Sequence, residues 1–194
     1  LPERVAFHRH LYPNCEVVEG DISVENIFST IVEKAKDKQC DFIIATPPCQ
    51  GMSTAGLKKK DDPRNRLIIP TVEIIKLLKP KFILLENVPE QLTTQILING
   101  EWKTIPNYLK DELGDVYYFN NKHLVNAQNY GVPQTRERCV FLLSRKDLNV
   151  KWEFPEPSDN IITLRDAIGD LPSLDPLVRE KDKRDQFPNV IKLR

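Results

Sequence analysis

Glycine is scarce in this 194-residue chain, which has seven glycines and no Gly-x-Gly sequence. The glycine pair that opens many nucleotide-binding turns is therefore absent. The four cysteines have no paired spacing, which argues against a disulfide framework or a zinc site and favours a reducing compartment. No apolar run is long enough to span a membrane, and no signal peptide is visible.

Neither sign of charge dominates, because Lys plus Arg and Asp plus Glu each total 28 and the net charge is zero. Any affinity for a polyanion must therefore come from local patches or from parts outside this chain. A chain of this length can bury one core of ordinary size, and no internal repeats are apparent.

One cysteine stands directly after an apolar segment that is typical of a buried parallel strand. Residues 41–45, Asp-Phe-Ile-Ile-Ala, lead into Thr46-Pro47-Pro48-Cys49-Gln50. Ligands of open α/β sheets bind at the carboxyl ends of the strands, and the two prolines stiffen the turn. Cys49 is therefore a candidate nucleophile. The alternative is a small buried cysteine without a chemical role.

A second apolar segment, residues 81–85, ends in Glu86-Asn87-Val88-Pro89. Residues 67–79 lie between the two segments and place apolar side chains at helical spacing, which predicts a βαβ unit. Such strands are usually neighbours, about 4.8 Å apart when paired, so Cys49 and Glu86 can face one pocket. A solvated strand end is the alternative for Glu86.

Polar side chains precede a third apolar segment, residues 139–143. Strand alternation would put Gln134, Arg136 and Arg138 on one face. Two guanidinium groups and an amide suit a carboxylate, a carbonyl-bearing ring or a phosphate, because Arg offers forked donors. An edge strand that carries solvated charges is the alternative.

Together these motifs resemble the DNA (cytosine-5) methyltransferase family. They occur in the family's order as Pro48-Cys49-Gln50, Glu86-Asn87-Val88 and Gln134-Thr135-Arg136-Glu137-Arg138. Each motif alone is weak, whereas the ordered set is specific. The resemblance runs from about residue 12 to about residue 172 and includes Gly20-Asp21-Ile22 and the segments at residues 62–67 and 164–172.

The resemblance and the order of elements imply an α/β fold: a partial Rossmann-like S-adenosylmethionine-dependent methyltransferase sheet with flanking helices and a terminal β-hairpin. Strands are expected near residues 15–19, 41–46, 82–86, 116–125 and 139–144, and helices near residues 3–11, 24–36, 67–79 and 105–113. Residues 1–150 are expected to form a partial catalytic domain. Residues 151–194 are expected to link it to a target-recognition domain.

The implied reaction is methyl transfer from S-adenosylmethionine to carbon 5 of cytosine in DNA. The Cys49 thiolate would add to carbon 6 and turn the ring into an enamine that attacks the methyl group. Glu86 would act at nitrogen 3 and Arg138 at the carbonyl oxygen, where electron density accumulates, while Arg136 would hold the catalytic segment or the base. A cytosine within a duplex would first be flipped out.

Residues 51–66 contain clustered Lys and Arg, as a loop that touches DNA phosphates would, although solvation alone also explains a charge run. The resemblance implies DNA contacts from Gln50, Ser53, Lys58, Lys59, Lys60, Arg64 and Gln134. Gln50 would hold the gap left by the flipped base or the attacking geometry.

For the cofactor, the resemblance implies that Asp21 and Ile22 lie against the adenine of S-adenosylmethionine, with Pro48 and Leu67 lining the pocket. Asp21 could instead be a helix cap beside Ser23. No metal is implied.

The implied partner is double-stranded DNA, and the implied location is the bacterial cytoplasm. The resemblance favours an enzyme of a restriction-modification system or a related phage enzyme. No membrane is implied. Two alternatives stay open: a tRNA cytosine-5 methyltransferase, and a non-catalytic module that binds nucleic acid or a partner subunit. The family's Phe-x-Gly-x-Gly turn and acidic ribose ligand do not occur in this sequence. A second polypeptide could supply them.

The 194-residue chain by itself is expected to bind S-adenosylmethionine poorly and not to methylate DNA, because it lacks the glycine turn and the ribose ligand. Adding the missing segment, in the same chain or as a second polypeptide, should restore binding. Isothermal titration of the cofactor into the chain measures this directly. Tight stoichiometric binding would show that the site is complete without that segment.

Overall fold

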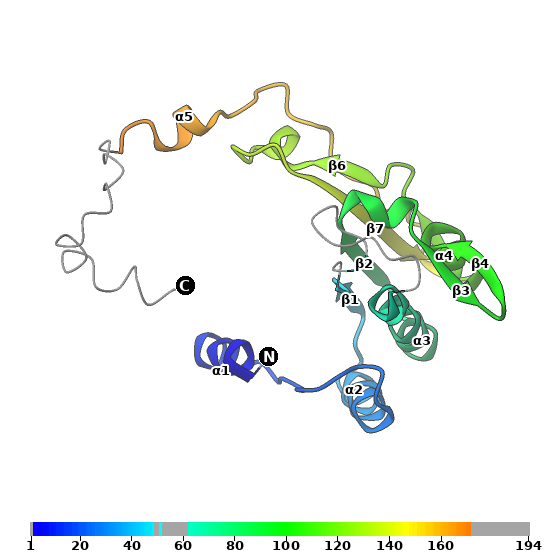
Figure 1. Ribbon diagram of the computed structural model, residues 1–194. Coiled ribbons are helices and arrows are strands. Elements are labelled where there is room, and N and C mark those ends of the chain that lie inside the picture. The colour runs from blue at the N-terminus through cyan, green and yellow to red at the C-terminus, as the bar shows by residue number, and fades with distance from the viewer. Residues whose placement is uncertain (1, 49–50, 52–61, 172–194) are drawn as a thin grey trace.

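A five-stranded sheet organises the computed structural model, which describes residues 2–48, 51 and 62–171 (Figure 1). The strand order is β1-β2-β7-β5, and β6 also pairs with β7. β1 and β2 are parallel, whereas β7 is antiparallel to β2, β5 and β6. The strands are β1 (Phe42–Ala45), β2 (Phe82–Asn87), β5 (Tyr117–Phe119), β6 (Leu124–Asn126) and β7 (Glu137–Arg145).

The core lies on the face of the sheet that α3 (Ile68–Leu78) and α4 (Ile105–Leu113) cover. Alternation along β2 buries Ile83 and Leu85 completely, and the side chains of Phe82, Leu84 and Glu86 are only partly buried. α4 begins at Thr104, whose hydroxyl accepts a hydrogen bond from the backbone N–H of Asn107. α2 (Glu25–Asp37) contacts α3.

Most of the predicted elements are confirmed. The predicted helices correspond to α1 (Pro2–Leu11), α2, α3 and α4, and the predicted strands at residues 41–46, 82–86 and 139–144 correspond to β1, β2 and β7. The βαβ unit is confirmed as well. The order of elements therefore follows from apolar periodicity.

The strand predicted near residues 15–19 is wrong. Val17 and Val18 are half-buried between α1 and α2, but they belong to no β-ladder. A β-branched pair favours extended backbone, whereas a strand also requires a neighbour that accepts and donates its hydrogen bonds. The described part of the chain offers none beside this segment.

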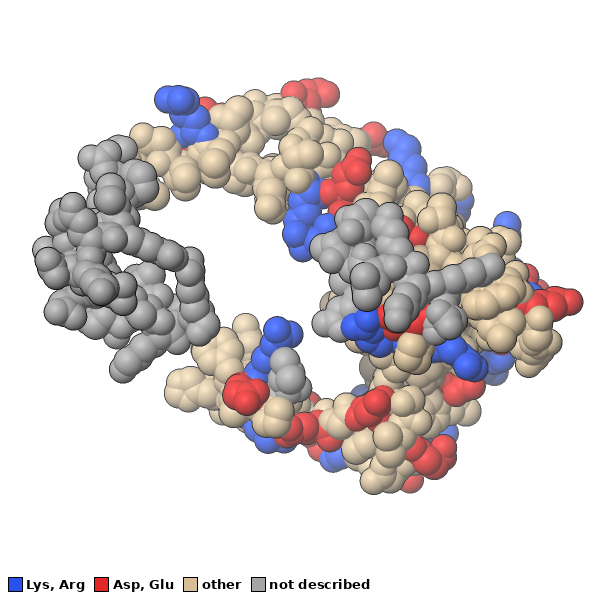
Figure 2. All heavy atoms as spheres, in the orientation of Figure 1, with Lys and Arg blue, Asp and Glu red and all other residues tan. Residues whose placement is uncertain are grey.

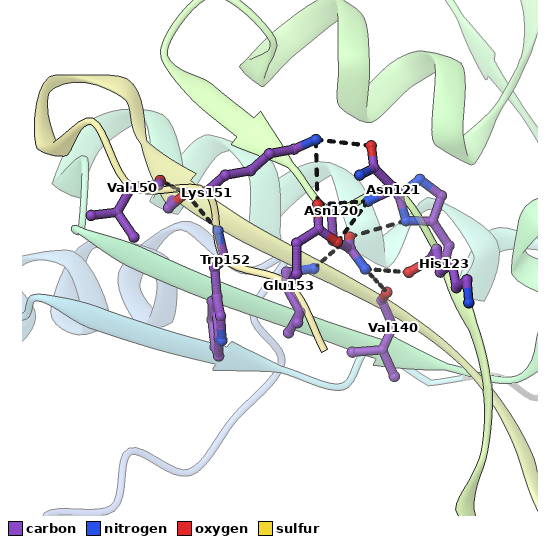
Figure 3. A network of polar contacts seen from close by, with 11 residues as sticks. Asn120, Asn121, His123, Val140, Val150, Lys151, Trp152 and Glu153 are labelled. Carbon is purple, nitrogen blue, oxygen red and sulfur yellow. Dashed lines mark hydrogen bonds and ion pairs between the residues drawn. The ribbon is translucent and has the colours of Figure 1, made fainter. Parts of the chain in front are cut away.

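The strand predicted at residues 116–125 is divided into β5 and β6 by a turn around Asn120 (Figure 3). The Asn120 side chain replaces ladder bonds at this point. Its Oδ1 accepts from the backbone N–H of Leu142 at 3.0 Å, and its Nδ2 donates to the carbonyl oxygens of Lys122 and Val140. Both short strands therefore remain paired with β7.

A two-stranded hairpin that the sequence analysis did not predict precedes α4. It consists of β3 (Gln95–Ile98) and β4 (Glu101–Thr104). Asn99 and Gly100 connect the strands with φ angles of 50° and 86°. An Asn-Gly pair is a strong signal for such a turn, so the sequence did contain the information.

Residues that follow β7 also pack on the sheet. The Trp152 ring meets the rings of Phe42 and Phe82 edge-on, with centroids 5.8 and 5.7 Å apart. Lys151 and Glu153 both bond to Asn121, as Figure 3 shows. These contacts fall just past the predicted boundary at residue 150, which itself stays a prediction.

α1 and α5 (Leu164–Ile168) stand apart from the sheet (Figure 1) and bury none of their residues. Two 3-10 helices flank the site described below: η1 (Pro63–Leu67) and η2 (Pro89–Leu92). Two others, η3 (Ala127–Tyr130) and η4 (Lys146–Leu148), flank β7. No helix in the described ranges is both long enough and apolar enough to cross a membrane.

Gln91 provides a test of the core. It is 0% exposed, and neither its Oε1 nor its Nε2 has a hydrogen-bond partner among the described residues. A buried polar group without a partner costs about 1–3 kcal/mol. Met matches Gln in length, so Gln91→Met is expected to raise the free energy of unfolding by about 1 kcal/mol in urea denaturation.

The control is Gln128→Met, which removes an amide whose Oε1 accepts from the Thr135 hydroxyl at 2.7 Å. That variant should gain no stability. A loss of stability in Gln91→Met would contradict the interpretation and would show that the amide is satisfied in solution.

Candidate active site

Glu86 and Arg138 meet at the end of the sheet. They lie on adjacent strands, β2 and β7, where Glu86 pairs with Val140 and Arg138 is its diagonal neighbour on the same face. The Nε of Arg138 lies 3.0 Å from Oε1 of Glu86, and the side chains are 24% and 33% exposed, respectively. The pair is thus partly open to solvent and available to a ligand.

The segment that leads to Cys49 lies beside this pair. The ladder between β1 and β2 ends at Ala45 and Leu85, and residues 46–48 continue past it. The Nδ2 of Asn87 donates to the carbonyl oxygen of Pro47 at 3.0 Å. The structure therefore joins the end of β2 to the proline turn. The predicted facing of Cys49 toward Glu86 stays a prediction, because Cys49 lies outside the described residues.

Most of the predicted DNA contacts also lie outside the described residues: Gln50, Ser53, Lys58, Lys59 and Lys60. Arg64 is described, at the start of η1. Its guanidinium pairs with Asp62 at 2.6 Å, and this hydrogen-bonded partner raises the pKa of Arg64. The Arg64 side chain is 46% exposed and that of Asp62 only 10%, so Arg64 can reach another anion from its solvent side.

Gly51 lies against the residues that follow the undescribed segment. A Cβ added at Gly51 would come within 2.3 Å of Oδ1 of Asn65 and 2.8 Å of Cγ of Asp62. Asn65 is 2% exposed, and its Oδ1 has no hydrogen-bond partner among the described residues. Any side chain at position 51 would therefore displace this contact, which accounts for the glycine.

The expectation that Gln134, Arg136 and Arg138 share one strand face is wrong in part. β7 begins at Glu137, so Gln134 and Arg136 precede it. The backbone N–H of Arg136 donates to Oδ1 of Asn126 at 3.0 Å, and its carbonyl oxygen accepts from Ala127. These bonds hold the segment against the end of β6, where strand alternation does not apply.

Gln134 and Arg136 are exposed. Among the described residues, neither side chain bonds to Glu86 or Arg138. Of the predicted polar set, the structure brings together Glu86 and Arg138. The roles of Gln134 and Arg136 stay predictions.

Asp21 occupies a turn before α2. Its Oδ1 accepts from the backbone N–H of Ser23 at 2.9 Å and from the Ser23 hydroxyl at 2.7 Å, and these bonds lower the pKa of Asp21. The N-cap of α2 is Val24, so Asp21 is not the helix cap. The preceding Gly20 has φ of 155° and touches Ile27, where a Cβ would approach to 2.6 Å.

The residues predicted to bind the cofactor suit an adenine ring chemically. Asp21 is exposed and ionised near neutral pH, and among the described residues its Oδ2 accepts no bond, so it can accept one from an amine. Ile22 and Leu67 are half-buried apolar residues, and Pro48 is exposed at the end of the proline turn. That these residues form one pocket stays a prediction. No three His, Cys, Asp or Glu residues gather as a metal site within the described ranges.

Cys139 is a structural cysteine. It is 0% exposed, and burial, with a smaller effect of the Glu86 carboxylate, raises the pKa of its thiol to about 12. At neutral pH the thiol is protonated and inaccessible, so Cys139 cannot serve as a nucleophile. Two residues that the sequence analysis did not single out are Asn87 and Asn126, whose amides hold the backbone of the site.

Figure 2 shows acidic and basic side chains dispersed over the face that it presents. This agrees with the zero net charge of the sequence. On this face, the described residues form no field of one sign, so a polyanion would be bound by a few local cations.

Comparisons with known proteins agree with the motifs. The profile of the family described as C-5 cytosine-specific DNA methylase matches residues 5–189. The type II methyltransferase M1.HgaI of Avibacterium volantium is 39% identical over 181 residues, which are 90% of this chain and 49% of that protein. M.MthTI of Methanothermobacter thermautotrophicus is 41% identical over 138 residues, covering 71% of this chain and 40% of the relative.

A solved structure supports the same assignment. It is that of a DNA modification methyltransferase encoded within a prophage of E. coli; it has a TM-score of 0.64 and 28% identity, and the match covers 88% of this chain and 46% of that one. The chain thus spans about half the length of the relatives it matches. Its α/β sheet has the fold of the S-adenosylmethionine-dependent methyltransferases, as predicted. The chain belongs to the C-5 cytosine-specific DNA methylase family.

Proposed function

We propose that the enzyme containing this chain methylates carbon 5 of a flipped cytosine in double-stranded DNA through a covalent Cys49 adduct. The observation that carries the proposal is the Glu86–Arg138 pair at the carboxyl end of β2, beside the proline turn that leads to Cys49. A carboxyl group and a guanidinium on one face match nitrogen 3 and the carbonyl oxygen of a cytosine ring. The relatives with type II methyltransferase names favour a restriction-modification role, in the cytoplasm where bacterial DNA lies.

Each of this chain's groups has a distinct task in the reaction. The Cys49 thiolate forms a bond to carbon 6, and the displaced electron pair of the ring moves toward nitrogen 3 and the carbonyl oxygen. Glu86 holds the proton at nitrogen 3, and Arg138 stabilises negative charge at the oxygen. Carbon 5 of the enamine then forms a bond to the methyl group, and the proton at nitrogen 3 returns to Glu86. A solvent base takes the carbon 5 proton, and the electron pair of that C–H bond reforms the ring double bond as the bond from carbon 6 to sulfur breaks and releases the Cys49 thiolate.

S-adenosylmethionine supplies that methyl group when it is bound. Asp21 would accept a bond from the adenine amine, and Ile22, Pro48 and Leu67 would provide apolar contact. Gln50, Ser53, Lys58, Lys59, Lys60, Arg64 and Gln134 would contact the DNA, and Arg136 would hold the base or the catalytic segment. The remainder of the cofactor site would come from a further segment of the same chain or from a second polypeptide.

The complete enzyme is expected to form a stable adduct with DNA that contains 5-fluorocytosine in its recognition sequence, because fluorine at carbon 5 prevents the final proton loss. Mass spectrometry of the trapped peptide should find the bond at Cys49. Cys49→Ser should abolish the adduct, whereas Cys15→Ser should not, since Cys15 follows α1 and belongs to none of the three motifs. Trapping at Cys139, or on RNA and not on DNA, would overturn the assignment.

Glu86→Gln is expected to slow methylation by about 10²-fold or more while DNA affinity changes little, because proton transfer to the ring contributes mainly in the transition state. Gln keeps the size of Glu and can still accept a bond from Arg138. Single-turnover rates and DNA dissociation constants measure the two effects. Glu137→Gln removes an exposed carboxylate beside Arg138 and is the control. Equal losses of rate and affinity in Glu86→Gln would make Glu86 structural.

A further inference from the structure

We infer that Asn87 is a positioning residue that holds the backbone of the proline turn and, through it, the direction in which Cys49 is presented. The inference deepens the proposed function and rests on it for the role of Cys49. The contact that supports it joins Asn87 to Pro47. Asn87 is 3% exposed at the last position of β2, and its side chain bonds to the turn that leaves β1.

The bond acts where the sheet can no longer hold the chain. The ladder between β1 and β2 ends at Ala45 and Leu85, and continuing its register would place Pro47 opposite Asn87. Pro47 and Pro48 have no backbone N–H, so they cannot donate to β2 as strand residues do. Their carbonyl oxygens are the hydrogen-bonding groups that remain. The Asn87 amide donates to one of them at 3.0 Å and so continues the pairing by a side chain.

The amide can bind in one orientation only. Its Oδ1 accepts from the backbone N–H of Val88 at 2.8 Å, which leaves Nδ2 to face Pro47. Both ends of the amide are therefore used, and the group is almost fully buried. Asp has the same shape but would place a second acceptor against the Pro47 carbonyl. Leu has a similar volume but offers no donor.

Neighbouring side chains on β2 thus serve the two halves of the site. Alternation places Glu86 on the half-exposed face with Arg138 and turns Asn87 toward the buried face beside Cys139. The β2 backbone at Asn87 is itself held by pairing with β7. Loss of the amide should therefore leave the Glu86–Arg138 pair in place and release the turn.

The experiment compares Asn87→Asp and Asn87→Leu with Asn120→Asp in the complete enzyme. Asn120 is equally buried, at 3% exposure, and its Nδ2 also donates to backbone carbonyl oxygens, but it lies between β5 and β6. It therefore controls for loss of a buried amide elsewhere. Two readouts are used: deuterium uptake by the peptide covering residues 46–51, and the rate of adduct formation with 5-fluorocytosine DNA.

Both Asn87 variants are expected to take up deuterium faster over residues 46–51 and to form the adduct about 10- to 100-fold more slowly, with DNA affinity within about threefold of the wild type. Asn120→Asp should change neither readout per folded molecule. The use of two Asn87 variants keeps the test decisive if a buried carboxylate prevents folding.

Unchanged uptake and an unchanged adduct rate in a folded Asn87 variant would overturn the inference. So would equal effects in the Asn87 and Asn120 variants, since these would report general destabilisation. If the wild-type enzyme forms no adduct, the proposed function fails, and deuterium uptake in the absence of DNA still decides whether Asn87 holds the turn.

Discussion

The position of β2 between a parallel and an antiparallel neighbour determines where the proposed catalytic groups lie. Its parallel partner β1 ends at the same edge and leads into the proline turn, while β7 starts at that edge and carries Arg138. Residues that are far apart in the sequence therefore meet within one or two strand spacings. The core beneath them, in which α3 and α4 cover Ile83 and Leu85, fixes the register that makes this meeting possible.

Alternation along β2 then separates two requirements of such a site. A group that touches a substrate has to be accessible, and Glu86 is 33% exposed. A group that holds backbone has to be protected from competing water, and Asn87 is 3% exposed. Consecutive residues of one strand meet these opposite demands because they face opposite sides of the sheet. The sequence Glu-Asn-Val thus carries a chemical group and its support together.

Much of this arrangement could be predicted from the sequence, and the remainder shows what local patterns omit. The apolar segments at β1 and β2 were predicted correctly, because in the fold each of them also finds a neighbouring strand with which to pair. Val17 and Val18 have the same β propensity, but pairing is a property of the surrounding chain, and no window of sequence contains it. The family resemblance implies that Glu86 and Arg138 act on one ring, and the structure places Nε of Arg138 3.0 Å from Oε1 of Glu86.

Side-chain bonds to backbone were harder to foresee. Alternation from Arg138 predicts a strand position for Arg136, yet the Asn126 side chain holds its backbone just before β7 begins. Nothing within residues 134–138 reveals a partner ten positions earlier. Likewise, the sequence placed Asn87 in a motif but did not give its bond to Pro47, which depends on the register of two strands. Amides that bridge distant backbone segments therefore depend on the fold and cannot be read from a local sequence pattern.

The Glu86–Arg138 pair also bears on how the site can bind a base. In the structure the two groups form an ion pair through one contact of 3.0 Å, which a ring that binds both groups must replace. Partly exposed pairs of this kind contribute only about 0–1 kcal/mol, because water screens them and competes for the same bonds. Exchanging the pair for ring contacts therefore costs little, whereas a buried pair would resist it. Half-exposure thus allows the two groups to be preorganised near one another and still to part for a substrate.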